Sequence, residues 1–123
     1  MNPNSGEAHG SLGAALGRIR DWDGEIAEER KALRLNPNDD VAHGDLGDAL
    51  GGKGDLDGAM VEYREALRLN PNNSWWHFNL GLALEEKGDL RGAEEEFRAA
   101  YTLNPKSSTY KRFYERLLQE VNQ

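Results

Sequence analysis

The residues of this chain that could take part in chemistry are three histidines, several adjacent acids and one glycine-rich stretch. The histidines, His9, His43 and His77, recur at a constant spacing of 34 residues. Zinc ligands must converge about 2 Å from one point, whereas neighbouring packed helices lie roughly 8–10 Å apart. We therefore expect the histidines to form a ladder of packing contacts, and we predict no metal site.

Adjacent acids could suggest paired-carboxylate catalysis, but their spacing argues against it. Glu85 and Glu86, for example, are consecutive, and consecutive residues of a helix point about 100° apart. We expect most such side chains to be solvated and Glu94 to pair with Arg98 one helical turn later. Glu25 and Glu29 are the only acids predicted to sit near a core, where burial could raise a pKa, and we interpret them as part of a distorted terminal repeat.

The stretch Gly51-Gly52-Lys53-Gly54 resembles a phosphate-binding loop only in composition. It follows no predicted strand, and no serine or threonine comes after the lysine, as such a loop requires. The order of residues also suggests no Ser/His/Asp arrangement. We predict a protein with no catalytic residues and no cofactor, and therefore not an enzyme.

Charge and composition narrow the class of partner. The net charge is −7, with the acidic excess in residues 1–105 and a small positive excess in residues 106–123. A field of this sign repels phosphate backbones, so we expect no nucleic-acid partner and favour apolar or cationic ones. No apolar run is long enough to span a membrane, and MNPNSGEAHG lacks the regions of a secretion signal. We therefore expect a soluble, cytoplasmic protein that does not bind membranes.

The elements that must position these residues repeat along the chain. The hexapeptide LRLNPN occurs at 33–38 and again at 67–72, with a looser copy, YTLNPK, at 101–106. Within each period the apolar spacing is helical, and in the second and third copies a Gly-Asp pair divides it into two helices. Gly54 and Gly88 can end the first helices, and Asp55 and Asp89 can cap the second. Each Asn-Pro then stops the second helix, and Asp39, Asn73 or Ser107 can cap the next.

The register of the third copy identifies the repeat. His77-x-x-Leu80-Gly81-x-x-Leu84 is followed by Gly88, Ala93, Ala100 and Pro105. This pattern resembles the signature of the tetratricopeptide repeat family. The small residues have a physical role that can be checked, because Gly47 and Gly81 remove side chains where the two helices of a hairpin approach closely.

The resemblance implies an all-α fold, a right-handed superhelical solenoid of three antiparallel helix hairpins plus a C-terminal capping helix. We expect one domain over residues 1–123, with repeats at 6–39, 40–73 and 74–107 and the capping helix at 108–123. The first copy departs from the pattern, because Arg20 replaces the turn glycine and Glu25 and Glu29 replace a small and an aromatic residue. We expect its second helix to pack less well, or to shift so that the carboxylates reach water.

In this family the first helices line a concave surface that binds peptides, so the resemblance implies a set of partner-binding residues. The set is Glu7, Arg18, Val41, Gly44, Asp48, Trp75, Phe78, Leu82, Glu85 and Glu86. Trp75, Phe78 and Leu82 form an apolar stripe that either contacts a partner or packs beneath the C-terminal helix. The family's clamp for a terminal carboxylate is not supported, because its positions here hold Gly10, Ala14, Asp45, Trp75 and Asn79.

We therefore predict a non-enzymatic protein-interaction module that binds a peptide or helical segment of a partner in this groove. The partner is expected to be apolar with cationic character. Two alternatives stay open: a self-assembling structural unit, which would be a homo-oligomer, and an excised or designed fragment of a longer repeat protein whose activity lies elsewhere.

Overall fold

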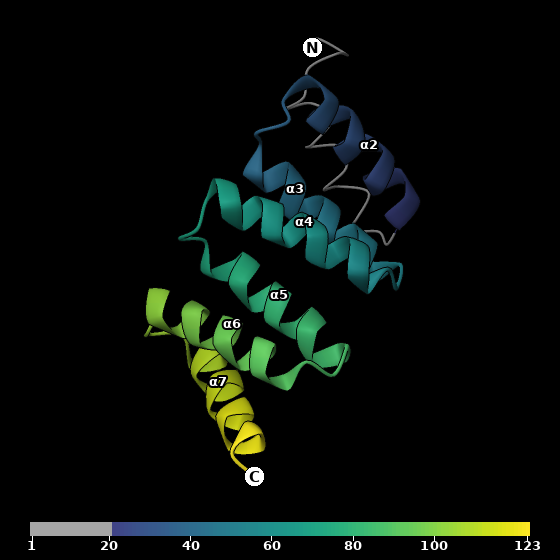
Figure 1. Cartoon of the computed structure of the whole chain (residues 1–123). Helices are drawn as coiled ribbons and strands as arrows, with labels where there is room; N and C mark the ends of the chain where they lie inside the picture. The colour runs from purple at the N-terminus through teal and green to yellow at the C-terminus, as the bar shows by residue number, and fades with distance from the viewer. Residues whose placement is uncertain (1–20) are drawn as a thin grey trace. The chain divides into compact units, whose positions relative to one another are not determined.

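The structure is a computed structural model that describes residues 21–123. Most of this range is helical (Figure 1). No strand occurs within that range. The helices of this range are α2 (Trp22–Leu35), α3 (Asp40–Gly52), α4 (Leu56–Leu69), α5 (Ser74–Glu86), α6 (Leu90–Leu103) and α7 (Ser108–Val121). The all-α fold class predicted from the repeats is confirmed.

The helices begin at the polar residues that the repeat predicts as caps. Asp39 Oδ1 accepts a bond of 3.1 Å from the backbone N–H of Ala42, and Asn73 Oδ1 accepts one of 3.2 Å from Trp76. Such bonds satisfy backbone donors that have no partner inside the helix. Equivalent bonds are accepted by Asp21, Asp55, Asp89 and Ser107.

The turns inside the hairpins depend on glycine. Gly54 has φ +92° and Gly88 has φ +88°, a left-handed conformation that residues with a Cβ rarely adopt. Between hairpins, α2 ends at Leu35 and α4 ends at Leu69, each directly before an Asn-Pro pair. The residue before proline avoids helical angles, so both kinds of boundary follow from local sequence as predicted.

The chain divides into two compact units, and the first is Met1–Leu69. In its described part, α3 and α4 form a hairpin and α2 lies against α3 (Figure 1). A Cβ at Gly47 would lie 2.7 Å from the ring of Tyr63 and 3.2 Å from the carbonyl oxygen of Ala59. The hairpin therefore closes only because position 47 has no side chain, which confirms the role predicted for this glycine.

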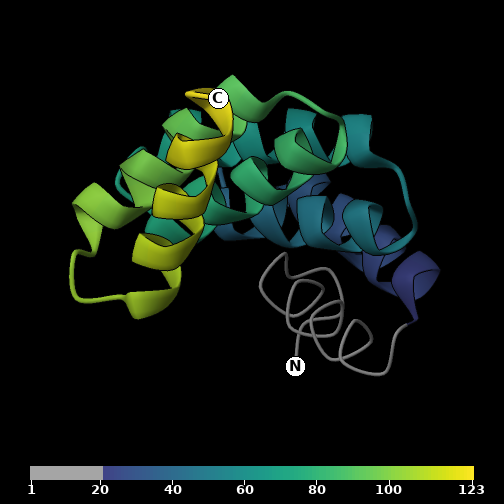
Figure 2. The same cartoon turned by 90° about the horizontal axis from the view of Figure 1, so that it is seen from below.

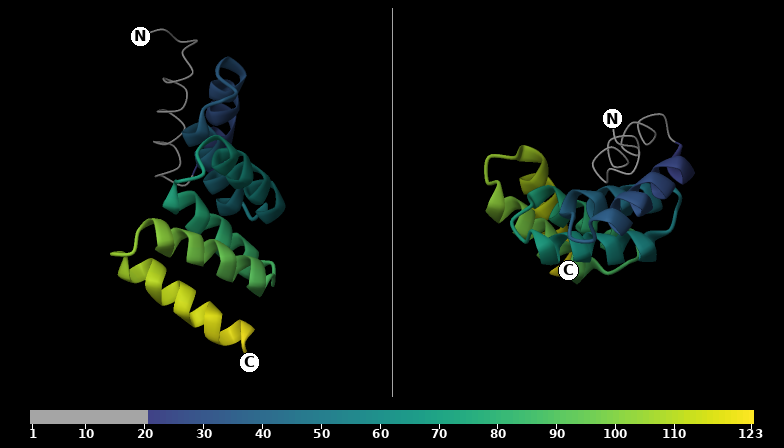
Figure 3. Two further views of the ribbon diagram at one scale, coloured as in Figure 1. Left: turned by 60° about the vertical axis from the view of Figure 1, so that its left-hand side comes forward. Right: turned by 90° about the horizontal axis from the view of Figure 1, so that it is seen from above.

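The second unit is Asn70–Gln123. Here α5 and α6 form the hairpin, and α7 lies against α6, as Figure 2 and Figure 3 show. A Cβ at Gly81 would lie 2.6 Å from the ring of Phe97. Phe97 and Leu117 are both fully buried, so the last helix completes the core of this unit.

Some predictions concern residues that the structure does not describe. The first helix expected for repeat 6–39, and with it Glu7, His9, Arg18 and Arg20, lies outside residues 21–123. Of that repeat, the structure describes α2 and the turn after it.

Candidate functional site

The predicted partner-binding residues that the structure describes lie on the first helices of the two hairpins, α3 and α5. On α3, Val41 is 52% exposed, and Asp48 follows two helical turns later. Tyr63 of α4 donates a hydrogen bond from its hydroxyl to Asp48 Oδ1. Gly44, between Val41 and Asp48, is buried. This face of α3 is therefore apolar at its start and acidic toward its end.

On α5, the exposed apolar side chains are Trp75 and Leu82, which are 50% and 36% exposed. They are seven residues apart in the helix, so they project from the same face. Leaving large apolar side chains in water is unfavourable, and neighbouring exposed ones typically mark a contact surface.

Phe78, which lies between Trp75 and Leu82 in the predicted stripe, is only 6% exposed. Its ring centroid lies 5.1 Å from those of both Tyr110 and Phe113 of α7. These tilted and edge-on contacts are the arrangements that aromatic rings prefer. Phe78 is thus a core residue and not part of an open surface. The alternative interpretation, burial under the C-terminal helix, holds for this member of the stripe.

The two predicted acids at the end of α5 differ in their environment. The two terminal guanidinium nitrogens of Arg116, Nη1 and Nη2, donate to Glu85 at 2.6 and 3.0 Å. Arg116 also lies over the ring of Phe113, 5.1 Å from its centroid, a favourable cation–π arrangement. Glu86 is exposed. The charge of Glu85 is therefore largely neutralised within the unit.

The irregular repeat places two carboxylates inside the first unit. Glu25 is 5% exposed and Glu29 is fully buried, so the expectation that they shift to reach water is wrong. Glu25 Oε2 and both oxygens of Glu29 have no hydrogen-bond partner among residues 21–123. The residues equivalent to Glu29 in the other two hairpins are aromatic. A carboxylate at this position loses its hydration without gaining a hydrogen bond from another described residue.

Burial changes the ionisation of this acidic cluster. Desolvation raises the pKa of Glu29 to about 8, with the nearby charges of Asp45 and Glu25 adding to the effect. Desolvation likewise raises the pKa of Glu25 to about 7, and that of Asp45 to about 6. Charged forms are disfavoured both by burial and by neighbours of like sign. At neutral pH the interior of this unit therefore holds carboxyl groups that carry protons.

The described histidines do more than pack. His43 Nδ1 lies 2.7 Å from Glu62 Oε2 and its Nε2 lies 2.9 Å from the carbonyl oxygen of Pro37. His77 has the corresponding partners Glu96 and Pro71, at 2.7 and 2.8 Å. The predicted packing ladder omitted these bonds. A 34-residue alignment of the acids, which places Glu62 and Glu96 in register, is the signal that could have revealed them.

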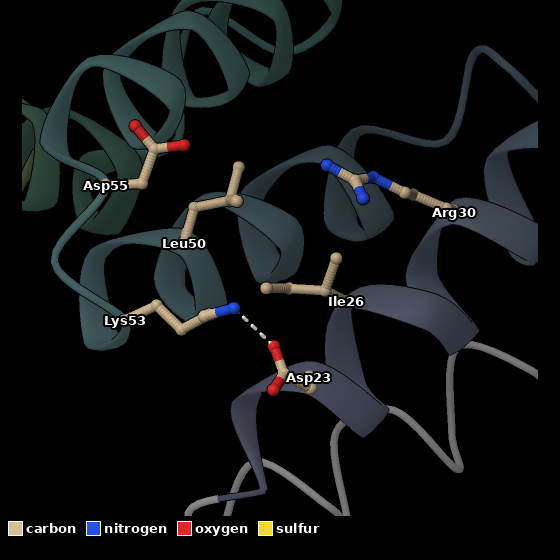
Figure 4. Close-up of a pocket in the computed structure, with 6 residues that line it drawn as sticks. All are labelled: Asp23, Ile26, Arg30, Leu50, Lys53 and Asp55. Carbon is tan, nitrogen blue, oxygen red and sulfur yellow. Dashed lines mark hydrogen bonds and ion pairs between the residues drawn. The ribbon is translucent and has the colours of Figure 1, made fainter.

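A cleft opens in the first unit between α2 and the turn after α3 (Figure 4). Its volume is about 270 Å³, slightly below the range of about 300–1,000 Å³ usual for small-molecule sites. Lys53 bonds Asp23 across its mouth, as Figure 4 shows. The remaining lining residues are Ile26, Arg30, Leu50 and Asp55. A small, open cleft with a paired lysine offers no chemistry beyond surface contact.

Other classes of site receive no support from residues 21–123. No group of three or more His, Asp or Glu side chains in that range is arranged to hold a metal ion. None of the helices in the same range is both long and apolar enough to cross a membrane. Glu94 lies 3.9 Å from Arg98, which confirms their predicted ion pair.

Comparison with known proteins agrees with this geometry. Two family models match, one described as TPR repeat over residues 47–88 and one as tetratricopeptide repeat over residues 74–107. The fold is therefore that of an all-α helical-repeat protein of the solenoid class. The chain belongs to the tetratricopeptide repeat family. No curated protein matches it.

Solved structures share the fold at low sequence identity. The Arabidopsis OM64 TPR domain has a TM-score of 0.87 at 22% identity, covering 91% of this chain and 93% of that one. The Sgt2 TPR domain from Aspergillus fumigatus has a TM-score of 0.87 at 21% identity, with 95% and 79% covered. The first TPR of Spaghetti (RPAP3), bound to HSP90 peptide SRMEEVD, reaches 0.92 at 15% identity, with 100% and 98% covered.

Proposed function

We propose that this chain is a non-enzymatic protein-interaction module that holds a segment of a partner protein on the exposed face of α5. The observation that carries the proposal is the pair Trp75 and Leu82, which leave large apolar surfaces in water on one face of α5. The remaining large aromatic side chains of α5, Trp76 and Phe78, are buried. Within α5, Trp75 and Leu82 are therefore exposed although the neighbouring aromatic side chains are buried.

A partner segment with an apolar anchor fits this face. Tryptophan is among the residues that contribute most to binding energy, often about 2 kcal/mol or more when fully enclosed by a partner. Leu82, two turns along the same face, would receive a second apolar side chain at helical or extended spacing.

Cationic character in the partner is supported by an acid on the same helix. Glu86 of α5 is exposed, whereas Glu85 is paired with Arg116. We therefore assign the attraction of a basic partner to Glu86 and not to Glu85. Charges at the rim of an interface mainly raise the association rate and make it salt-dependent.

The structure of Spaghetti (RPAP3) contains an acidic HSP90 peptide, which supports peptide binding as a use of this fold. The same ligand class is not proposed here. Asp45, Trp75 and Asn79 stand at positions where the family's carboxylate clamp has basic or amide side chains, and Asp45 would repel an acidic peptide.

Selection from a random peptide library on the immobilised chain tests the proposal. We expect enriched peptides with an aromatic or aliphatic anchor next to lysine or arginine, and we expect the enrichment to be lost with Trp75→Ala/Leu82→Ala. Leu103→Ala is the control, because Leu103 is 41% exposed but lies on the second helix α6.

Two results would contradict the proposal. One is selection of acidic peptides, or of the same peptides by the double variant. The other is growth of particle mass with concentration in light scattering, abolished by Trp75→Ala/Leu82→Ala, which would assign the exposed pair to self-assembly.

A further inference from the structure

The ring of His43 is held between two groups that can only accept hydrogen bonds. Glu62 Oε2 of α4 lies 2.7 Å from Nδ1, and the carbonyl oxygen of Pro37, in the turn before α3, lies 2.9 Å from Nε2. The side chains of His43 and Glu62 are only 14% and 21% exposed. The contact with Glu62 is therefore partly shielded from water, whereas the contact with Pro37 lies at the surface.

The second unit repeats the arrangement on different residues. His77 Nδ1 lies 2.7 Å from Glu96 Oε2 of α6, and Nε2 lies 2.8 Å from the carbonyl oxygen of Pro71. The side chain of His77 is 17% exposed. Since both units show the same pairing, it is a property of the repeat and not an accident of one site.

Two acceptors impose a proton count on the ring. A neutral imidazole has one N–H and one lone pair, so it can satisfy only one acceptor and must direct its lone pair at the other. Both contacts are satisfied only when the histidine and its glutamate together hold one more proton than a neutral ring beside a carboxylate. Whether that proton lies on Nδ1 or is shared with the carboxylate, both bonds then exist.

We propose that Pro37–His43–Glu62 and Pro71–His77–Glu96 are proton-dependent clamps that fasten the turn before each hairpin to both of its helices. With the proton in place, one ring joins the turn, the first helix and the second helix. When the proton leaves, one of the two contacts becomes repulsive, and the ring can hold either the turn or the second helix but not both.

The charges around the rings favour the protonated form. Burial lowers the pKa of His43, but the hydrogen bond to Glu62, the Pro37 carbonyl and the charges of Glu62 and Glu65 raise it above its ordinary value. The hydrogen bond to Glu96 raises the pKa of His77 against the opposing effect of burial, and the Pro71 carbonyl adds to the rise. The clamps therefore open as pH rises through the raised pKa values of the two rings.

Each clamped turn also carries the cap of the following helix. Asp39 caps α3 and Asn73 caps α5, and the exposed Trp75 lies in the first turn of α5. Opening of the second clamp would loosen the part of α5 that presents Trp75. The clamp itself does not depend on the function proposed for that face.

The sequence contains the same spacing a third time, at Pro3, His9 and Glu28. Residues 1–20 lie outside the described part of the chain, so the proposal is made for the second and third copies.

NMR titration of the histidine rings in the full chain tests the clamps. We expect both ring nitrogens of His43 and His77 to carry protons at pH values below 6.5, and both rings to titrate above 6.5, the ordinary value. Glu96→Gln should lower the pKa of His77 and leave His43 unchanged, while Glu95→Gln, the neighbouring exposed acid, should change neither. Single His→Gln variants assign the signals.

Amide hydrogen exchange tests whether the clamp controls the turn. After correction for intrinsic chemistry, exchange at Asp39 and Asn73 should rise with pH by up to about tenfold per unit below the histidine pKa and level off above it, because the deprotonated fraction of the ring saturates there. In His77→Gln the rise at Asn73 should disappear while Asp39 keeps it.

The proposal is overturned if either ring is a neutral tautomer at pH values below its ordinary pKa. It is equally overturned if Glu96→Gln and Glu95→Gln shift His77 alike, or if exchange at the turns follows intrinsic chemistry alone.

Discussion

Gly47 of α3 lies so close to Tyr63 of α4 that a Cβ at position 47 would be 2.7 Å from the ring atom Cε1. In the same helix, a Cβ at Gly51 would meet only the methyl group of Ala59, at 3.7 Å, an ordinary contact. The two glycines are one helical turn apart, yet a side chain would clash at position 47 and fit at position 51.

Gly47→Ala should destabilise the chain by about 1–3 kcal/mol, because the ring of Tyr63 or the helix backbone must move. Gly51→Ala should stabilise it by about 0.5–1 kcal/mol, because alanine loses less backbone freedom than glycine on helix formation. Chemical denaturation of both variants measures the difference. Equal effects of the two substitutions would show that the approach of the hairpin helices is not tight.

The buried acids predict how stability depends on pH. Glu25 and Glu29 have folded-state pKa values of about 7 and about 8, against an ordinary value of 4.5. The folded state therefore binds more protons than the unfolded state in this interval, so the free energy of unfolding falls as pH rises from about 4.5 to about 8. Glu29→Gln should flatten this slope in denaturant titrations at several pH values. An unchanged slope would contradict the shifted ionisation of Glu29.

Glu25→Ala introduces the small residue found at this position in the other repeats, Ala59 and Ala93. It removes a buried carboxylate with an unpartnered oxygen, and we expect a gain of about 1 kcal/mol near pH 7. The gain should be larger near pH 8 than near pH 5, because the penalty for the buried carboxyl accumulates as pH rises from its ordinary pKa of 4.5 to its folded-state pKa of about 7. Thermal unfolding at the two pH values provides the comparison, and a loss of stability at pH 7 would rule the interpretation out.

Removal of α7 exposes an aromatic cluster. Phe78 and Phe97 both contact Phe113, and Phe78 also contacts Tyr110. Deleting 108–123 should lower the melting temperature and cause aggregation, since loss of each large buried side chain costs about 3–5 kcal/mol. Arg112→Ala, an exposed change on the same helix, serves as the control. A soluble truncated chain with an unchanged melting temperature would contradict the capping role of α7.

Binding and folding effects should separate along α5. Trp75→Ala should weaken the binding of a selected peptide by about 2 kcal/mol or more without lowering the stability of the fold. Phe78→Ala should lower the stability of the fold, because its ring is in the core. Glu86→Lys should slow association with a cationic peptide, and the difference from wild type should shrink as salt rises. Titrations at low and high ionic strength, with melting curves for each variant, provide the test. If Trp75→Ala binds normally while Leu103→Ala does not, the partner uses the second helices.

Local sequence was sufficient for the repeat itself. The turn glycines Gly54 and Gly88, the caps Asp39 and Asn73 and the stops at Asn-Pro were all predictable. Each depends on backbone angles or hydrogen bonds within about one helical turn, so the residues that decide the outcome are neighbours in the chain. The close approach at Gly47 and Gly81 was predictable for a related reason, because a fixed period places the two helices of a hairpin in a fixed register.

The surface of that repeat could not be assigned in the same way. Trp75 and Phe78 are both aromatic residues at helical spacing, yet one is exposed and the other buried, because Tyr110 and Phe113 arrive from α7, more than 30 residues later. Arg116 neutralises Glu85 for the same reason. Burial and charge pairing depend on segments that are distant in the chain and adjacent in space, and the spacing of residues within one helix carries no information about which of its faces such a segment will cover.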